Sequence, residues 1–479
     1  MGLTFTSLEF ILFLGVCFGL LHASGRLSVR TWLLVVCSYL FYLTFGLGGA
    51  LVLTFTAVVD FIVGRRLGNT TGEVTRKRWL WAGLLANLGP LAFFKYSGFF
   101  LGIIAAILHP LGIRVSLPSS PVISIAGFSY FTFAGVSYVL DVYWETMEPA
   151  GSLLAFVSYL VYFPKLIAGP IVRAADLLPQ FRQGFKITTQ DFEIGCGYLL
   201  VGAVKKLVIA DQLASHVSTI LVAPQNYDAF TLVQGMVGYT VQIYADFSGY
   251  SDMAIGCARL MGIRFPQNFL MPYSSVNIAE FWRRWHVTMS TWFRDYVFLP
   301  LEFAGRGTRN ANVRASRNIV ITMLLCGLWH GPSWNFVVWG GLHGVALAVY
   351  QVYASMLRKA QPQNRSIVHP GTLMSRALTL SVVMVGWIFF GTQSLPVAIK
   401  YLSRIVTWRG DGVTLSSPYI LPLAALMLLA HLLINKDRNL IEEVATYSVP
   451  TRILTYAGAL LALACLVPSD TVPFAYLRF

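Results

Sequence analysis

Long apolar segments follow one another along almost the whole chain of 479 residues, and they constrain its fold more than any other feature. Apolar residues make up 56% of the sequence and charged residues only 12%, whereas soluble domains carry about 25% charged residues. A chain with so few charges cannot cover itself with solvated side chains. A spanning helix needs about 20 apolar residues. The segments therefore predict an all-α polytopic membrane protein with about 11 to 13 spans, some of them broken or re-entrant.

The positive charges fit a membrane protein as well. The net charge of +14 would suggest a nucleic-acid partner in a soluble chain, but Lys and Arg gather on the cytoplasmic side of membrane proteins. We therefore expect the lipid bilayer, and no nucleic acid, as a partner. The clearest cytoplasmic segment carries five charges, Arg65, Arg66, Arg76, Lys77 and Arg78. No positive charge precedes the first apolar run, Leu3–Leu21, so this run is predicted to be a membrane helix and not a cleaved signal peptide.

The chain shows no linker and no low-complexity segment, so residues 1–479 are predicted to form a single integral membrane domain. The six cysteines all lie in apolar runs without a CxxC pair. Their spacing fits neither a zinc site nor a disulfide framework, and we expect buried thiols and no metal.

Residues Glu280–Tyr296 read EFWRRWHVTMSTWFRDY and depart from plain membrane-helix composition. As one helix, this segment would have an aromatic face and a cationic, hydrogen-bonding face that carries Arg283, His286, Ser290 and Arg294. Two interpretations stay open. The segment is either an interfacial helix anchored by Trp and Arg, or a helix that lines a polar cavity with His286 facing into it.

Two further histidines lie in the apolar run Ile319–Tyr350. His330 follows Trp329 and precedes Gly-Pro, which is expected to end or kink the helix there. Ionisable residues at membrane depth are costly and usually face a cavity, although a neutral core histidine is the alternative, above all for His343.

Other polar residues interrupt apolar runs. Asp246, Ser248 and Asp252 lie within Leu232–Met261, and the two carboxylates need partners, for which Arg283 or Arg284 are expected. A structural ion pair between two helices is the simplest role for them. Lys165 lies in the Pro-broken stretch FPKLIAGP, which reads as a re-entrant or cavity-lining element.

The chemistry of these residues is compatible with acyl transfer to a hydroxyl. The sequence has no HExxH, no Gly-x-Ser-x-Gly and no P-loop, which argues against catalytic zinc, a serine hydrolase and an ATP-driven pump. A histidine at membrane depth can take a proton from a hydroxyl, and acyl transfer to a hydroxyl needs such a base.

The chain resembles the membrane-bound O-acyltransferase family, in its bacterial branch that acetylates exopolysaccharides. The resemblance rests on the motifs FPKLIAGPI, YADFSGYSDMAIG, FLMPY, EFWRRWHVTMSTWFRDY and GLWHG. It implies a helical fold around a central tunnel, with a catalytic core over residues 122–350 and C-terminal helices and an aromatic tail over 351–479. It also implies that His330 is the catalytic histidine and His286 the second active-site histidine. Lys165 departs from the family pattern, where a neutral polar residue or histidine is expected.

The expected function is an acetyltransferase of the bacterial inner membrane. The donor is expected to be acetyl-CoA, with no tightly bound cofactor, and the acceptor an exported polysaccharide such as alginate or cellulose, reached directly or through a periplasmic acetyltransferase partner. Side chains expected to bind the donor or line its cavity are Arg283, Arg284, Ser290, Arg294, Trp329, Asn335, His343 and Lys165. Tyr476, in the aromatic C-terminal tail, is a candidate acyl relay, with membrane anchoring or partner docking as the alternative roles of the tail.

Three other functions stay open at this point. The first is D-alanyl transfer toward teichoic acid, which would require a docking surface for a carrier protein. The second is a polysaccharide or lipid transporter, which would need no catalytic histidine. The third is a structural scaffold, which would leave the histidines unexplained.

Overall fold

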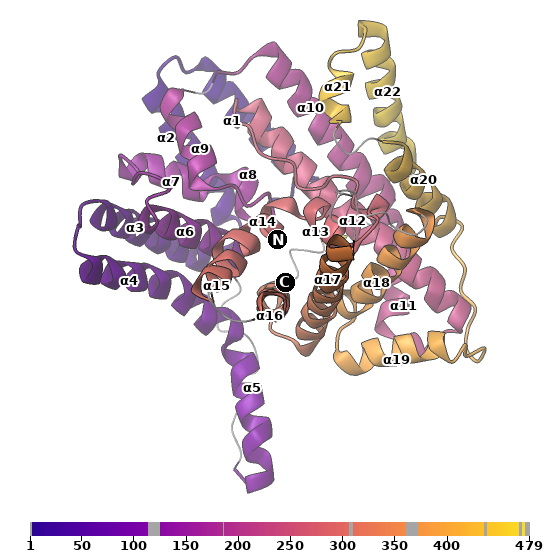
Figure 1. Cartoon of the computed structure of the whole chain (residues 1–479). Helices are drawn as coiled ribbons and strands as arrows, with labels where there is room; N and C mark the ends of the chain where they lie inside the picture. Colours follow the sequence, from indigo (N-terminus) through magenta and orange to yellow (C-terminus); the bar gives the residue numbers. More distant parts are fainter. Residues whose placement is uncertain are drawn as a thin grey trace. The chain divides into compact units, whose positions relative to one another are not determined.

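The computed structural model describes residues 2–113, 125–184, 186–305, 310–360, 372–434, 438–468 and 472–474. The regular structure of this part is helical, with short 3₁₀ and π turns and one isolated bridge between Tyr227 and Val413 (Figure 1). The predicted all-α fold is therefore confirmed for the described residues.

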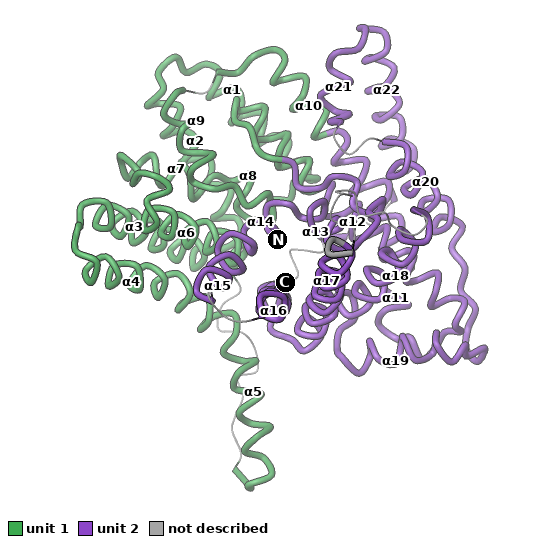
Figure 2. Tube along the Cα trace, in the orientation of Figure 1, with its two compact units in different colours: residues 1–199, 250–266 green, residues 200–249, 267–479 purple. Residues whose placement is uncertain are grey.

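Two compact units make up the chain (Figure 2). Unit 1 comprises residues 1–199 and 250–266, and unit 2 comprises residues 200–249 and 267–479. The helices α10 (Thr189–Ala203) and α12 (Ala229–Leu260) each contribute residues to both units. The predicted single membrane domain, with its catalytic core over 122–350, stays a prediction.

Unit 1 is built around the mutual packing of α3, α4 and α6. Small residues let these helices approach closely, because a methyl group added at Gly64 would lie 2.2 Å from the Tyr138 hydroxyl oxygen. A buried polar pair joins α4 to α3, since the Asn87 side-chain amide donates to Asp60 Oδ1 at 2.6 Å. The helices of this unit are α1 (Leu8–Ala23), α2 (Leu27–Leu43), α3 (Leu47–Gly68), α4 (Glu73–Leu91), α5 (Ser97–Leu108), α6 (Phe128–Tyr143), α7 (Leu153–Val161), α8 (Phe163–Leu166) and α9 (Ala174–Gln183), with a π turn at Ala92–Tyr96 and a 3₁₀ turn at His109–Leu111.

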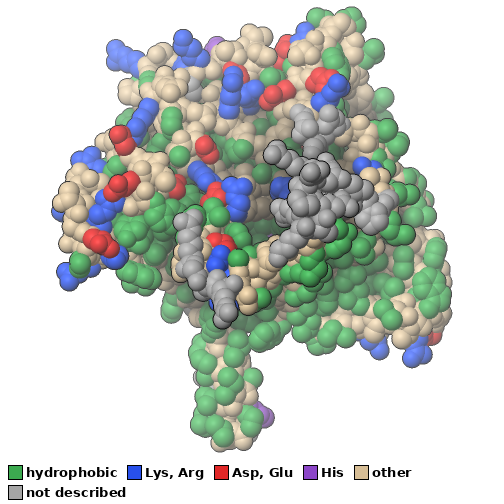
Figure 3. Space-filling model, in the orientation of Figure 1, with side chains coloured by type: hydrophobic (Ala, Val, Ile, Leu, Met, Phe, Trp, Pro, Cys, Tyr) green, Lys and Arg blue, Asp and Glu red, His purple; other side chains and the backbone are tan. Residues whose placement is uncertain are grey.

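Several helices present apolar side chains to their surroundings. In α1, Phe10, Leu14, Cys17 and Leu21 form a buried stripe, while Leu8 and Leu12 on the opposite face are more than half exposed. No residue of α5 is buried, and its surface is largely hydrophobic (Figure 3). A helix that is apolar on every face is typical of a lipid environment.

Unit 2 contains a closely packed helical hairpin, α16 with α17. Glycines bring the two helices into backbone contact, since a methyl group added at Gly327 would lie 2.1 Å from the Phe336 carbonyl oxygen. The helices of this unit are α11 (Asp211–Val222), α13 (Ile278–Arg284), α14 (Val287–Phe293), α15 (Leu299–Ala304), α16 (Ala311–His330), α17 (Trp334–Ala360), α18 (Thr372–Gly391), α19 (Leu395–Val406), α20 (Ile420–Leu433), α21 (Leu440–Val444) and α22 (Val449–Leu466). The π turns η3 (Val204–Ala210) and η6 (Arg294–Phe298) and the 3₁₀ turns η4 (Pro224–Asn226) and η5 (Pro272–Ser274) complete it.

Five helical segments of the described chain are long and apolar enough to cross a membrane: Leu47–Gly68, Glu73–Leu111, Trp334–Leu357, Thr372–Gly391 and Val449–Leu466. The apolar helices α1, α2 and α20 are shorter. Others of the predicted apolar runs fold as short or broken helices, and the 11 to 13 spans stay a prediction. The break after His330 lies where Gly-Pro predicts it, whereas α12 runs unbroken through Asp246 and Asp252.

Candidate active site

The sequence analysis predicted one helix over the aromatic segment 280–296, and this prediction is wrong. The segment forms a series of short helices around a sharp break. Helix α13 ends at Arg284 and α14 begins at Val287, with Trp285 and His286 between them. His286 has φ +42° and ψ +55°, a left-handed conformation that is uncommon for a residue with a side chain and costs about 1–3 kcal/mol. The single cationic face expected from the sequence therefore does not form.

Asn268 holds this break in place, and the sequence analysis did not single it out. Its side-chain oxygen accepts hydrogen bonds from the Thr288 amide at 3.2 Å and from the Thr288 hydroxyl at 2.9 Å. Its backbone oxygen accepts from the Val287 amide at 2.9 Å. The side-chain oxygen also lies 3.1 Å from Nδ1 of His286. The only sequence signal for this role was its place directly before the FLMPY motif.

These contacts fix the tautomer of His286. A backbone amide can only donate, so the Asn268 atom that faces Thr288 is the carbonyl oxygen and not the amide nitrogen. His286 Nδ1 must then donate to that same oxygen. In the neutral ring, Nε2 therefore carries the lone pair and is the nitrogen able to accept a proton.

Aromatic rings enclose His286, which is completely buried. The ring of Phe247, on α12, lies edge-to-face at a centroid distance of 4.7 Å. Phe269 stacks at 6.4 Å, and Trp329 lies at 6.2 Å. This setting keeps water away from the imidazole and fixes its orientation.

His330 is the last residue of α16 and is only 3% exposed. The chain leaves the helix through Gly331 in an extended conformation, where a side chain would run into the Phe336 ring. The His330 ring is packed by aromatic neighbours at centroid distances of 4.8–6.2 Å, namely Trp329, Phe336, Trp339 and Phe390.

Trp329 joins the two histidines. Its ring centroid lies 6.2 Å from that of His286 and 4.8 Å from that of His330. Both histidines belong to unit 2, so this arrangement depends on the packing of that unit alone. The expectation that they face one another across a cavity stays a prediction.

His343 continues the same row of rings, since Trp339 lies 5.0 Å from both His330 and His343. It is completely buried, and among the described residues neither of its ring nitrogens has a hydrogen-bond partner. A methyl group added at Gly386 would lie 2.7 Å from His343 Nε2. The glycine therefore lets α18 pack directly on this imidazole, inside an aromatic core that Trp282 completes at 5.2 Å.

Two of the polar residues expected at the cavity make local structural contacts. The Asn335 side-chain amide donates to the Thr392 carbonyl at 2.8 Å, which ties the start of α17 to the residue after α18. The Ser290 hydroxyl donates to the Trp285 carbonyl at 3.0 Å and so satisfies a backbone group at the helix break.

The arginines differ in their surroundings. Arg284 forms a short ion pair with Glu280 one turn earlier and donates to the Ser274 hydroxyl at 2.7 Å. Arg283 is exposed, and the Arg294 side chain, 59% exposed, pairs with its neighbour Asp295 at 2.6 Å. Of the three, Arg283 and Arg294 are thus the more accessible to an anionic substrate.

The partner of Asp246 is Lys206 and not the predicted Arg283 or Arg284. Lys206 Nζ lies 2.7 Å from Asp246 Oδ1 and 2.7 Å from Asp211 Oδ1, with side chains that are 1–5% exposed. The sequence signal for Lys206 was a charged pair inside the apolar run VGAVKKLVIA.

The other two residues of the predicted polar network lie in different units. Ser248 is completely buried in unit 2, and its hydroxyl has no hydrogen-bond partner among the described residues. Asp252 is half-buried and belongs to unit 1. The simple structural role expected for this motif therefore applies to Asp246, through Lys206.

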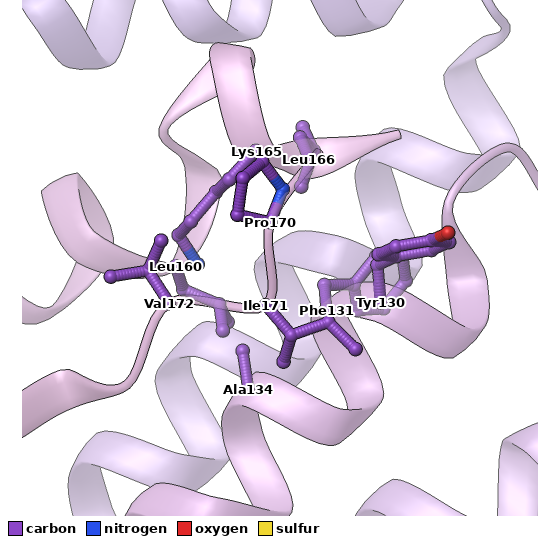
Figure 4. A pocket seen from close by; sticks show the side chains of 9 residues that line it. All are labelled: Tyr130, Phe131, Ala134, Leu160, Lys165, Leu166, Pro170, Ile171 and Val172. Atoms are coloured by element: carbon purple, nitrogen blue, oxygen red, sulfur yellow. The ribbon is translucent and has the colours of Figure 1, made fainter. Parts of the chain in front are cut away.

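Lys165 lies in unit 1, within a single helical turn between two bends of the chain. It is 4% exposed, and its Nζ lies 4.2 Å from the centroid of the Tyr159 ring. It also lines a cavity of about 10 Å³, which has room for about one water molecule (Figure 4). The two histidines lie in the other unit.

Tyr476 lies outside the described residues. Within the part of the chain that the structure describes, no group of three or more His, Cys, Asp or Glu side chains is arranged to hold a metal ion.

Comparison with known proteins agrees with the sequence motifs. Residues 150–393 match the family model of the membrane-bound O-acyltransferases. The chain is 37% identical over 413 residues to a probable alginate O-acetylase AlgI of Pseudomonas aeruginosa, a match that covers 85% of this chain and 76% of the relative.

Two other relatives broaden the comparison. A peptidoglycan O-acetyltransferase of Helicobacter pylori is 31% identical over 426 residues, which cover 83% of this chain and 77% of the relative. A teichoic acid D-alanyltransferase of Bacillus subtilis is 28% identical over 333 residues, 65% of this chain and 82% of the relative.

Proposed function

This chain belongs to the membrane-bound O-acyltransferase family, and on that premise we propose that it moves acetyl groups from cytoplasmic acetyl-CoA across the inner membrane for the O-acetylation of an exported polysaccharide. The coarser part of this function, that of a multi-pass membrane O-acyltransferase, follows from the family itself. The acetyl donor, the exopolysaccharide acceptor and the bacterial inner membrane are the proposal. Alginate comes first among the acceptors because the relative with 37% identity is a probable alginate O-acetylase.

One observation carries the assignment of the site: two buried histidines of unit 2 contact the same tryptophan ring, Trp329. His330 is the last residue of α16, directly before the chain leaves the helix at Gly331. We assign it as the general base. It takes the proton of the acceptor hydroxyl, the oxygen attacks the thioester carbonyl, and collapse of the tetrahedral intermediate breaks the C–S bond. The imidazolium then returns the proton to the departing thiolate.

The tautomer of His286 limits its role. A neutral His286 that donates through Nδ1 to Asn268 has only a lone pair at Nε2, so it suits the binding of a hydroxyl or thiol hydrogen better than the stabilisation of an oxyanion. We therefore propose that His286 orients the acceptor while His330 removes its proton. Arg283 and Arg294, both accessible, are the proposed contacts for the phosphates of the donor.

A relay completes the proposal. A hydrated polysaccharide is too bulky to reach a histidine in the membrane, so a smaller hydroxyl would receive the acetyl group first and pass it to a periplasmic acetyltransferase partner. Tyr476 carries such a hydroxyl close to the C-terminus. Replacing it with Phe keeps the ring and removes the oxygen, so a Tyr476→Phe variant that acetylates polymer at the wild-type rate would exclude the relay.

The test of the catalytic assignment is acetyl transfer by the purified protein in proteoliposomes with radiolabelled acetyl-CoA. His330→Ala is expected to abolish transfer, whereas His216→Ala, a half-buried histidine of α11 in the same unit, serves as the matched control. Full transfer by His330→Ala would refute the assignment. Transfer from a D-alanyl carrier protein and not from acetyl-CoA would favour the D-alanyltransferase alternative. A His330→Ala variant that still supports acetylation but blocks export of the polysaccharide would favour a transporter.

A further inference from the structure

A buried lysine binds the C-terminal segment of the chain inside unit 2. Lys206 Nζ donates to the carbonyl oxygen of Val472 at 2.6 Å, across 266 residues of sequence. The ring of Phe474 lies over the same ammonium group, with its centroid 4.6 Å away. Phe474 is 2% exposed and Val472 is half-buried, whereas Pro473 between them is exposed, so the Phe474 side chain anchors the segment in the unit.

The ammonium group has three close oxygen neighbours, and one of them belongs to the tail. Asp246 and Asp211 each provide a carboxylate oxygen at 2.7 Å, and Val472 provides the third oxygen. Asp246 and Val472 accept two of the three hydrogen bonds that an ammonium can donate, and Asp211 forms an ion pair with it at 2.7 Å. Without the tail, one donor of a lysine that is 2% exposed would lose its partner, and a buried donor without a partner is costly.

The π turn η3 brings this lysine to α12. Glycine at position 249 permits the contact, because a methyl group there would lie 2.8 Å from the Gly202 carbonyl oxygen and 3.2 Å from the Lys206 amide nitrogen. Helix α22, which leads toward the tail, packs against the same turn. The site is therefore assembled from three separate parts of the chain.

The lysine site and the candidate active site involve neighbouring residues of α12. Asp246, which binds Lys206, is followed on α12 by Phe247, whose ring packs edge-to-face on His286 at 4.7 Å. A tail held at Lys206 is thereby held next to the segment of α12 that touches a proposed active-site histidine.

We propose that Lys206, Asp211 and Asp246 form a seat for the C-terminal segment Val472–Phe474, and that this seat positions the tail for acyl transfer. The positioning role rests on the proposed function, whereas the seat itself does not. Lys206 acts here as a positioning residue. The seat is distinct from the histidine pair. Its lysine binds two groups of the segment, the Val472 carbonyl and the Phe474 ring, and its two carboxylates pair with the lysine.

Carboxypeptidase trimming of the purified full-length protein in detergent, followed by intact mass, tests the seat. In the wild type, removal of Phe474 and Val472 is expected to be slow. Lys206→Met is expected to speed it about tenfold to hundredfold, the weight of one charge-assisted hydrogen bond. Phe474→Leu keeps an apolar side chain and removes the ring, and is expected to speed it about threefold to tenfold, whereas Phe474→Trp is expected to restore wild-type trimming.

The matched control is Arg404→Met. Arg404 is another buried cation of unit 2. It binds the Tyr227 carbonyl at 2.9 Å and the Asp411 carboxylate at 3.3 Å, and among the described residues it forms no hydrogen bond or ion pair with Val472–Phe474. It is expected to leave trimming unchanged. If Lys206→Met and Phe474→Leu both trim like the wild type, the seat is refuted. This result does not depend on activity, so it stays separate from a failure of the His330 assignment.

Acetyl transfer then tests the positioning role. Lys206→Met and Phe474→Leu are both expected to lower kcat. KM for acetyl-CoA is expected to stay at the wild-type value, because the donor does not bind at the seat. Lys206→Met leaves two buried carboxylates without their cation and could fail to fold for that reason. Phe474→Leu keeps the lysine in place, so it tests the positioning role in that case as well. Faster trimming with an unchanged kcat would overturn the positioning role.

Discussion

Replacing Asn268 with Ala should damage the active site without touching either histidine. The change removes the oxygen that accepts from His286 Nδ1, from the Thr288 amide and from the Thr288 hydroxyl. The hydroxyl can rotate to another acceptor, so two buried donors lose their partner.

The magnitude follows from those two donors. A buried donor left without a partner costs about 1–3 kcal/mol, so Asn268→Ala should lower the free energy of unfolding by about 2–6 kcal/mol. The left-handed backbone of His286 adds strain of about 1–3 kcal/mol, which the native contacts no longer hold in place. A displaced His286 that loses only about 1.4 kcal/mol of transition-state binding would already slow transfer tenfold, so transfer should fall by at least that factor.

The assay combines unfolding of the purified protein in detergent with acetyl transfer in proteoliposomes. Asn268→Asp is the matched control, because it keeps an acceptor oxygen at the same position and should retain the tautomer of His286. Stability within about 0.5 kcal/mol of the wild type and transfer within twofold for Asn268→Ala would refute the reasoning, since surface substitutions without a role give changes of that size.

Three further predictions use other features of unit 2. His286→Gly should be more stable than His286→Ala by about 1–2 kcal/mol, because only glycine adopts the left-handed conformation without cost, while both variants should lose transfer; thermal unfolding of the pair checks this. Gly386→Ala should destabilise by about 1–3 kcal/mol through a clash with His343, and combining it with His343→Ala should recover part of the loss in the same measurement. Arg283→Gln and Arg294→Gln should raise KM for acetyl-CoA with kcat retained if they bind the donor phosphates, and an unchanged KM would exclude that role.

Local sequence features predicted the end of α16. The break after His330 follows from Gly-Pro, two residues whose backbone preferences act regardless of the rest of the chain. The kind of residue found at the candidate site, a histidine flanked by aromatic rings, was visible for the same reason.

The helix break at His286 could not be predicted in this way. The segment 280–296 has helical periodicity over its whole length, and no Gly or Pro marks the break. Asn268, which stabilises it, lies 18 residues earlier, and nothing in either segment indicates the other. Tertiary hydrogen bonds therefore overrode the local helix propensity.

The partner of Asp246 has the same explanation. The sequence indicated that a buried carboxylate needs a cation, and from the sequence alone Arg283 and Arg284 were suitable candidates. Only the packing of η3 against α12 selects Lys206, 40 residues earlier in the chain.

By itself, the sequence determined that this chain is a helical membrane protein, because apolar runs and scarce charges act through composition alone. It also determined the family, since the motifs agree in order along the chain. The tertiary structure decided which nitrogen of His286 carries the lone pair, which cation binds Asp246 and where the segment Val472–Phe474 is held. Each of these depends on a contact between groups far apart in sequence, the last across 266 residues, and only the folded chain brings such groups within hydrogen-bond distance.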